Sequence, residues 1–147
     1  RGPVRGAIHA AMAYAEGMST QRQRDTEFFD AIAAAYALVA ASDAQASAVE
    51  LEGLNRWGAE QGFDPADLEW LAERCRSSVT GLMAPEGAEA HRKLALGRVG
   101  RVTDGKRASL VLSAARVAVV ADERIDPAEE AALASVARAL GLDPDRA

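Results

Sequence analysis

Apolar side chains recur every three or four positions along most of the chain, which is the spacing of one face of an α-helix. This pattern predicts a first helix over residues 3–16 and a second, central helix over residues 20–42. Gly17 lies between them and is expected to end the first helix. The apolar face of the second helix comprises Phe28, Ile32, Ala35 and Val39.

Start and stop residues divide the rest of the chain into five further helices. An aspartate followed by proline favours a helix start, because the carboxylate accepts hydrogen bonds from unpaired amides and proline fits the first turn. Such pairs begin at Asp64 and Asp126, whereas Ser47 with Glu50 has the pattern of a capping box. The predicted helices cover residues 47–62, 64–81, 85–96, 104–121 and 126–141, with an irregular connection at Gly97, Gly100 and Gly105.

The chain contains an internal repeat at an offset of 79 residues (122 − 43). The offset superposes helix start and stop residues as well as apolar positions, which an Ala-rich composition alone does not explain. The Val-rich run at 111–120, which also fits a buried strand, aligns with the Ala-rich run at 32–41 and is therefore predicted to be helical. The matched pairs include Ala35 with Ala114, Leu54 with Leu133, Gly62 with Gly141, Asp64 with Asp143, and Pro65 with Pro144.

Size and composition indicate the fold class. A chain of 147 residues, 49% of them hydrophobic and 5% aromatic, is long enough for one domain with a core made mainly of small aliphatic side chains. We therefore expect an all-α fold, a single-domain helical bundle of about seven helices that spans residues 1–147. Its internal pseudo-twofold repeat has units at about residues 20–81 and 104–147, the second of them truncated.

Charge and cysteine content exclude several classes of protein. The net charge of −5 argues against a general nucleic-acid-binding protein. A single cysteine, Cys75, excludes an internal disulfide framework and a Cys-based zinc site, so the cytoplasm is the expected compartment and Cys75 an expected core residue. No uncharged apolar run approaches the ~20 residues that a transmembrane helix requires.

Charge is nevertheless uneven along the chain. Residues 92–107 contain six basic side chains and one acidic side chain, Asp104. Such a run is usually a solvated surface, which is the interpretation that we favour over contact with an anionic partner or a membrane surface. The basic residues are Arg92, Lys93, Arg98, Arg101, Lys106 and Arg107.

Each copy of the repeat carries a pair of carboxylates seven positions apart, Asp43 with Glu50 and Asp122 with Glu129. Each Asp is predicted at the C-terminal end of a helix, where the macrodipole disfavours a carboxylate by roughly 0.3–1 kcal/mol. A tight turn between helices can bring both carboxylates of a pair around one hard cation, such as calcium, magnesium or manganese, with zinc less favoured. Asp126 is a further candidate ligand, as is Glu123.

A second interpretation of these acids needs no metal. Glu50 and Glu129 lie where helices begin and are explained by capping, so the functional expectation rests on Asp43 and Asp122. Two carboxylates also make a weak site alone. A metal site therefore requires that the two loops meet near a pseudo-twofold axis or that a partner adds ligands. The loops are not EF-hands, because Pro127 occupies the position at which that loop needs glycine.

Residues 114–142 resemble the tellurite-resistance TerB family and its TerB-like relatives. Asp122, Ile125 and Glu129 occupy the marked positions of the family pattern, Asp-Gly-x-Ile/Val-x-x-x-Glu between two helices, with Leu-Gly-Leu after the second. The sequence departs from this pattern after each Asp, where the family has glycine. These two positions hold Ala44 and Glu123, and the weaker first copy matches at Asp43, Ala46 and Glu50.

The resemblance implies a cytoplasmic helical domain that binds or senses a metal in the response to tellurite or chemical stress. It also implies protein partners, including membrane-associated stress-response proteins, and a location in the cytoplasm that extends to the periphery of the inner membrane. The competing interpretation is a metal-free protein–protein interaction module that uses an apolar groove or the basic segment. We expect no enzymatic activity, because His9 and His91 are isolated and the chain has no phosphate-binding loop or nucleophile elbow.

Overall fold

The computed structural model describes residues 2–42, 51–120 and 126–145, and the side chains of residues 21–42, 51–119 and 126–145. Within these ranges the protein is entirely helical, which confirms the predicted fold class and the helical assignment of the Val-rich run. None of the helices there is long and apolar enough to cross a membrane. The helices are α1 (Gly2–Ala40), α2 (Glu52–Glu60), α3 (Pro65–Leu82), α4 (Ala88–Gly100), α5 (Gly105–Val120) and α6 (Pro127–Ala139).

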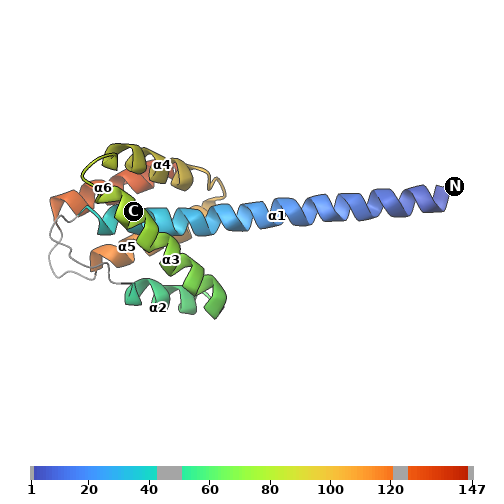
Figure 1. Ribbon diagram of the computed structural model, residues 1–147, viewed down its shortest axis with the longest axis horizontal. Helices are drawn as coiled ribbons and strands as arrows, with labels where there is room; N and C mark the ends of the chain where they lie inside the picture. The colour runs from blue at the N-terminus through green and yellow to red at the C-terminus, as the bar shows by residue number, and fades with distance from the viewer. Residues whose placement is uncertain (1, 43–50, 121–125, 146–147) are drawn as a thin grey trace.

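Helix α1 is both the centre of the bundle and a long projection from it. Its C-terminal half is surrounded by α3, α4, α5 and α6, whereas its N-terminal half extends away from the other helices (Figure 1). The helix is continuous through Gly17, so the prediction of two helices that are separated there is wrong. One glycine costs a helix interior only about 1 kcal/mol relative to alanine, and the alanines before it and the glutamines and arginines at 21–24 favour helix. The described ranges therefore contain six helices where about seven were expected.

The core forms around residues 31–39 of α1, all of which are buried. Five of these nine residues are alanines, so neighbouring helices can approach the axis of α1 closely on every side. Each surrounding helix contributes at least one fully buried aliphatic or thiol side chain. These are Leu71 and Cys75 from α3, Val99 from α4, Val111 from α5 and Val136 from α6.

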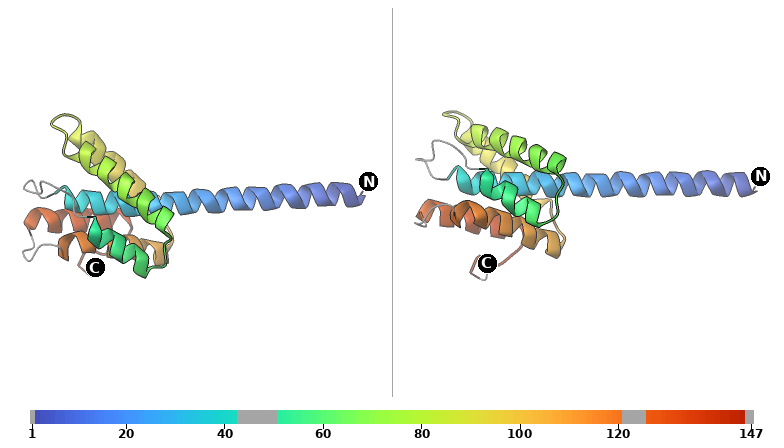
Figure 2. Two further views of the ribbon diagram at one scale, coloured as in Figure 1. Left: turned by 60° about the horizontal axis from the view of Figure 1, so that its bottom comes forward. Right: turned by 90° about the horizontal axis from the view of Figure 1, so that it is seen from below.

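The helices of the two predicted repeat units are interleaved. Helix α2 of the first unit packs on α5 of the second, and α6 of the second unit packs on α1 of the first as well as on α5. At the start of α2, a Cβ atom added to Gly53 would lie 3.1 Å from Cγ1 of Val117 near the end of α5. The C-terminal ends of α1 and α5 and the N-terminal ends of α2 and α6 consequently lie at the same end of the bundle (Figure 2).

The helix starts predicted at Asp64 and Asp126 and the helix stops predicted at Gly62 and Gly141 are confirmed. Asp64 and Asp126 each accept a hydrogen bond of 2.9 Å from a backbone N–H of the following first turn. Gly62 and Gly141 follow α2 and α6 with φ of 88° and 72°, in the left-handed region that glycine occupies at low cost.

The start of α2 differs from the prediction. The helix begins at Glu52, and Leu51 occupies its N-cap position in place of Ser47. Ser47 itself lies outside the described residues. Leu51 is buried, so the packing of an apolar side chain positions this helix end, where no side-chain capping bond is formed.

The bounds of α4 also differ from the prediction. The helix begins after Gly87, whose φ is 80°, and not at Pro85. It continues through Gly97, which the sequence places in an irregular connection, and ends at Gly100. Val99 is fully buried in this last turn, and its packing offsets the low helix propensity of the glycines beside it.

Candidate functional site

The structure describes two of the five predicted metal ligands, and both lie at the start of α6. Asp126 precedes the helix and Glu129 lies in its first turn. The other candidates lie outside the described residues, namely Asp43, Glu50, Asp122 and the secondary candidate Glu123.

Glu129 is the only charged side chain that is buried in the described part of the chain, with 3% of its surface exposed. A carboxylate loses favourable hydration when it is buried, so it requires compensating charge or hydrogen bonds. The N-terminal end of α6 supplies part of this compensation through its partial positive charge. A glutamate that only caps a helix does not need to be buried. The burial of Glu129 is therefore a feature that capping alone does not require.

Asp126 has a structural role that needs no metal. Its Oδ1 accepts a hydrogen bond of 2.9 Å from the backbone N–H of Ala128. Asp64, which is not a predicted metal ligand, accepts a similar bond at the start of α3. Capping is thus a sufficient explanation for Asp126, and the same explanation does not extend to the burial of Glu129.

A metal site at Glu129 needs ligands from beyond the described residues. Within these residues, no group of three or more His, Cys, Asp or Glu side chains is close enough to hold a metal ion. The fold does, however, bring together the residues that directly precede two of the predicted ligands. Ser42, which directly precedes Asp43, lines the same pocket as Ala128, which directly precedes Glu129.

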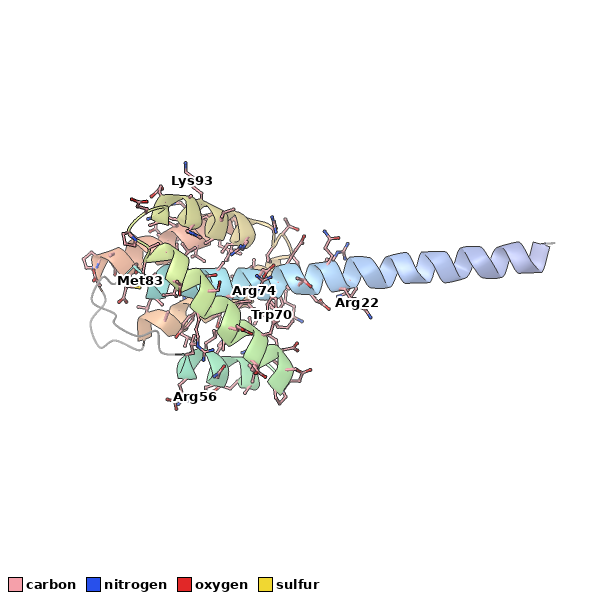
Figure 3. The ribbon with its side chains drawn as sticks, viewed as in Figure 1. Arg22, Arg56, Trp70, Arg74, Met83 and Lys93 are labelled. Atoms are coloured by element: carbon pink, nitrogen blue, oxygen red, sulfur yellow. The ribbon has the colours of Figure 1, made fainter. Side chains whose placement is uncertain are left out.

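This pocket, which we call the apolar pocket, has a volume of about 350 Å³ and lies between the ends of α1, α3, α4 and α6. Its walls are mainly aliphatic, with Glu89 and Arg92 of α4 as its charged members. Met83 follows Leu82 of the pocket wall and is 44% exposed at the end of α3 (Figure 3). The aliphatic wall residues are Leu38, Ala41, Leu82, Ala88, Leu96, Ala128, Ala131 and Ala132.

Cys75 is a core residue, as predicted. It is fully buried, and the loss of hydration on burial raises the pKa of its thiol to about 12, although nearby Arg76 acts in the opposite direction. Because nucleophilic attack and metal binding both need the thiolate, Cys75 is unsuited to either at neutral pH.

The tryptophans serve packing. Trp57 is buried, and its Nε1–H donates a hydrogen bond of 3.1 Å to Oγ of Ser113 on α5. Trp70 lies edge-on to Phe29 of α1, and the guanidinium carbon of Arg74 lies 4.9 Å from the centroid of the Trp70 ring (Figure 3). These contacts attach α2 and α3 to the rest of the bundle.

A second pocket, which we call the arginine pocket, lies where the projecting part of α1 leaves the bundle. It has a volume of about 490 Å³ and is formed by α1, the α4–α5 connection and the start of α5. Arg24, Arg101 and Arg107 line it from these three elements. The basic run in the sequence indicates two of these arginines. Arg24 is 77 positions from Arg101 (101 − 24), so only the fold shows that it belongs with them.

The family model described as "Tellurite resistance protein TerB" matches residues 29–147. The matched range begins within α1 and includes α2 to α6 and both carboxylate pairs. The projecting part of α1 precedes it. No curated protein and no solved structure matches the chain.

Proposed function

The chain belongs to the tellurite resistance protein TerB family, and on this basis we propose that it binds or senses a divalent cation in the response to tellurite or chemical stress. The proposed ligands are Asp43, Glu50, Asp122 and Glu129, with Asp126 as an additional candidate. Because all five are carboxylates, calcium, magnesium and manganese are the cations that suit them best.

The burial of Glu129 carries this proposal. Its carboxylate is buried at the end of the bundle where α1 and α5 end and α2 and α6 begin. A divalent cation is a group that would offset the lost hydration of a buried carboxylate. The contact of Ser42 and Ala128 with one pocket supports a site that combines both repeat units.

Titration calorimetry with calcium, magnesium, manganese and zinc tests the proposal. We expect heat of binding from at least one of the first three cations and a higher Tm in its presence. Glu129→Gln keeps the shape of the side chain and should weaken this binding by about tenfold or more, since it removes one ligand charge. Glu130→Gln is the matched control, because Glu130 is the exposed neighbour in the same helical turn.

The absence of heat and of any Tm shift with all four cations would contradict the proposal. Equal affinities for the wild type and Glu129→Gln would remove Glu129 from the ligand set. We also propose that the protein is located in the cytoplasm, up to the periphery of the inner membrane. Its proposed partners are membrane-associated stress-response proteins.

The apolar pocket favours a second candidate function, a metal-free protein–protein interaction module. Its aliphatic walls and the exposed Met83 beside it suit an apolar partner surface. The effect of divalent cations on the Tm distinguishes the two functions. A metal-free module has the same Tm in a chelator and in millimolar divalent cation, whereas a metal-binding domain does not.

A further inference from the structure

Three arginines line the arginine pocket, and only one of them is in an ion pair within the described residues. Arg107 forms an ion pair with Asp25, in which Nη2 lies 2.7 Å from Oδ1. Arg24 and Arg101 are exposed and form no ion pair with any residue that the structure describes. Two guanidinium groups, one on α1 and one at the end of α4, are thus available to a ligand.

Two acidic residues also line the arginine pocket, and each has a contact of its own. Glu27 accepts a hydrogen bond of 3.4 Å from the side-chain amide of Gln23, one turn earlier on α1. Asp104 accepts one of 3.4 Å from the backbone N–H of Lys106 at the start of α5. With Arg107 paired with Asp25, the two remaining arginines equal these two acids in number, and Lys106 and the N-terminal end of α5 add positive potential beside the pocket.

The floor of the arginine pocket is apolar. Phe28 and Val102 line it, and both are buried. The guanidinium carbon of Arg107 lies 5.1 Å from the centroid of the Phe28 ring, so this arginine is held against the floor. Thr103 adds a hydroxyl group to the wall. A ligand that fits this pocket has an anionic group for the arginines and a small apolar part for the floor.

We propose that the arginine pocket binds a phosphate monoester carried by a small organic group. A phosphate monoester has a charge of about −1.5 to −2 at neutral pH and three terminal oxygens. It can therefore accept hydrogen bonds from Arg24 and Arg101 at the same time, in the bidentate geometry that guanidinium groups favour. The volume of about 490 Å³ accommodates a phosphate together with a small ring or chain. None of the proposed metal ligands lines the arginine pocket. Phosphate binding and cation binding can therefore be tested separately, and either can fail without the other.

Phenyl phosphate and inorganic phosphate are suitable probes, with phenol as the uncharged control. Titration into ¹⁵N-labelled protein should shift the backbone amide signals of Thr103, Gly105 and Lys106 in NMR spectra. Calorimetry should show tighter binding of phenyl phosphate than of inorganic phosphate, since only the former reaches the apolar floor. Phenol should produce no comparable shifts.

Arg24→Gln and Arg101→Gln should each weaken binding of phenyl phosphate by roughly tenfold, as expected for loss of a charge-assisted hydrogen bond. Both residues are exposed, so these variants should keep the Tm of the wild type. Arg56→Gln is the matched control, because Arg56 is an exposed arginine on α2, remote from the place where α1 leaves the bundle (Figure 3). The proposal is contradicted if millimolar phenyl phosphate shifts none of the three amides, or if Arg56→Gln weakens binding as much as Arg101→Gln.

A lipid headgroup is another source of the same chemical group, and vesicles distinguish it from a soluble ligand. Vesicles of phosphatidylcholine with phosphatidic acid should bind the protein only if the phosphate can reach the pocket from a membrane surface. Displacement from such vesicles by phenyl phosphate would support the pocket and identify the lipid as a source. Vesicle binding that phenyl phosphate does not displace would place lipid recognition elsewhere and contradict the proposal for lipids.

Discussion

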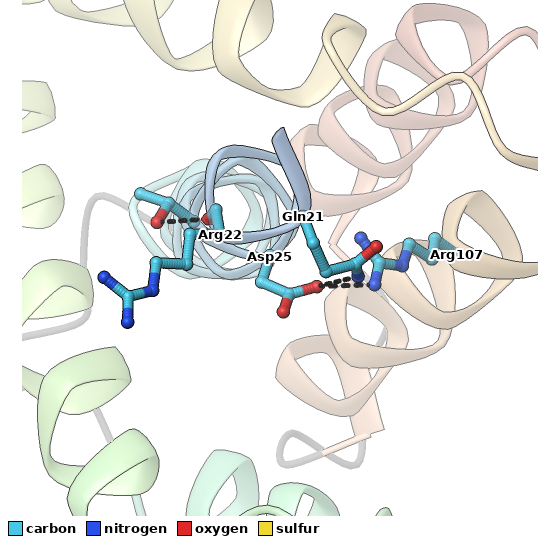
Figure 4. Close-up of polar contacts among 5 residues, drawn as sticks. Gln21, Arg22, Asp25 and Arg107 are labelled. Carbon is cyan, nitrogen blue, oxygen red and sulfur yellow. Dashed lines mark hydrogen bonds and ion pairs between the residues drawn. The ribbon is translucent and has the colours of Figure 1, made fainter. Parts of the chain in front are cut away.

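Arg107 on α5 and Asp25 on α1 form an ion pair across 82 positions of the sequence, with Nη2 and Oδ1 2.7 Å apart. The same oxygen of Asp25 accepts a hydrogen bond of 3.0 Å from Nε2 of Gln21 (Figure 4). The Arg107 guanidinium also packs against the ring of Phe28. These contacts attach α5 to α1 at the point where α1 leaves the bundle.

We expect Arg107→Gln to lower the free energy of unfolding by about 1 kcal/mol, which urea denaturation can measure. Asp25 is 46% exposed and Arg107 28% exposed at the side chain, so solvent screens the pair and limits its contribution. The contact with the Phe28 ring adds to the loss. Arg56→Gln breaks only an exposed pair on one helix and should change stability by less than about 0.5 kcal/mol. A larger loss for Arg56→Gln than for Arg107→Gln would contradict this ranking.

Two glycines should respond oppositely to alanine substitution. Gly62→Ala should lower the free energy of unfolding by about 1 kcal/mol, because φ is 88° there and an L-residue is strained in that region. Gly97→Ala should raise it by about 0.5–1 kcal/mol, since Gly97 lies inside α4 and a new Cβ atom would meet no atom within 4 Å. Thermal and urea denaturation of both variants would check the opposite signs.

The two aspartate caps separate structural from metal-binding roles. Asp64→Ala and Asp126→Ala should each cost about 1 kcal/mol of stability through loss of the capping bond. If Asp126 is also a metal ligand, only Asp126→Ala should weaken cation binding in calorimetry. Unchanged cation affinity in both variants would leave Asp126 as a cap alone.

The Cys75 thiol should make stability fall at high pH. Burial raises its pKa from 9.0 to about 12, so above pH 9 the unfolded chain releases a proton that the folded protein retains. The thiol contribution is therefore complete below pH 9 and is lost as the pH rises toward 12, by up to about 1.4 kcal/mol per pH unit. Cys75→Ala should lack this component of the pH dependence when urea denaturation is repeated from pH 8 to 11. An identical slope in both proteins would contradict the assignment.

Features set by local chemistry were predictable from the sequence. Asp64 caps α3 and Gly62 ends the preceding turn because each acts on residues within a few positions of itself. The continuity of α1 through Gly17 was not predictable in this way, because the cost of one glycine is small compared with the helix preference of the long segment around it.

Both candidate sites include a feature that depends on tertiary packing and not on local sequence rules. Local rules explain Glu129 as a capping residue, but its burial depends on the packing of other helices against α6, which no spacing in the sequence encodes. Arg24 likewise joins Arg101 only because α1 lies beside the α4–α5 connection. The expectation that Asp43 and Asp122 are metal ligands remains a prediction.

Helix α2 contacts α5 and helix α6 contacts α1, so two helix pairs join the segments of the two predicted repeat units. Two separate copies of a single unit could make the contacts of α2 with α5 and of α6 with α1 only by associating with each other. In one chain this association no longer depends on concentration. One chain can also carry different residues at equivalent positions of the predicted repeat, as at Ala44 and Glu123, where a dimer of identical units would carry the same residue twice.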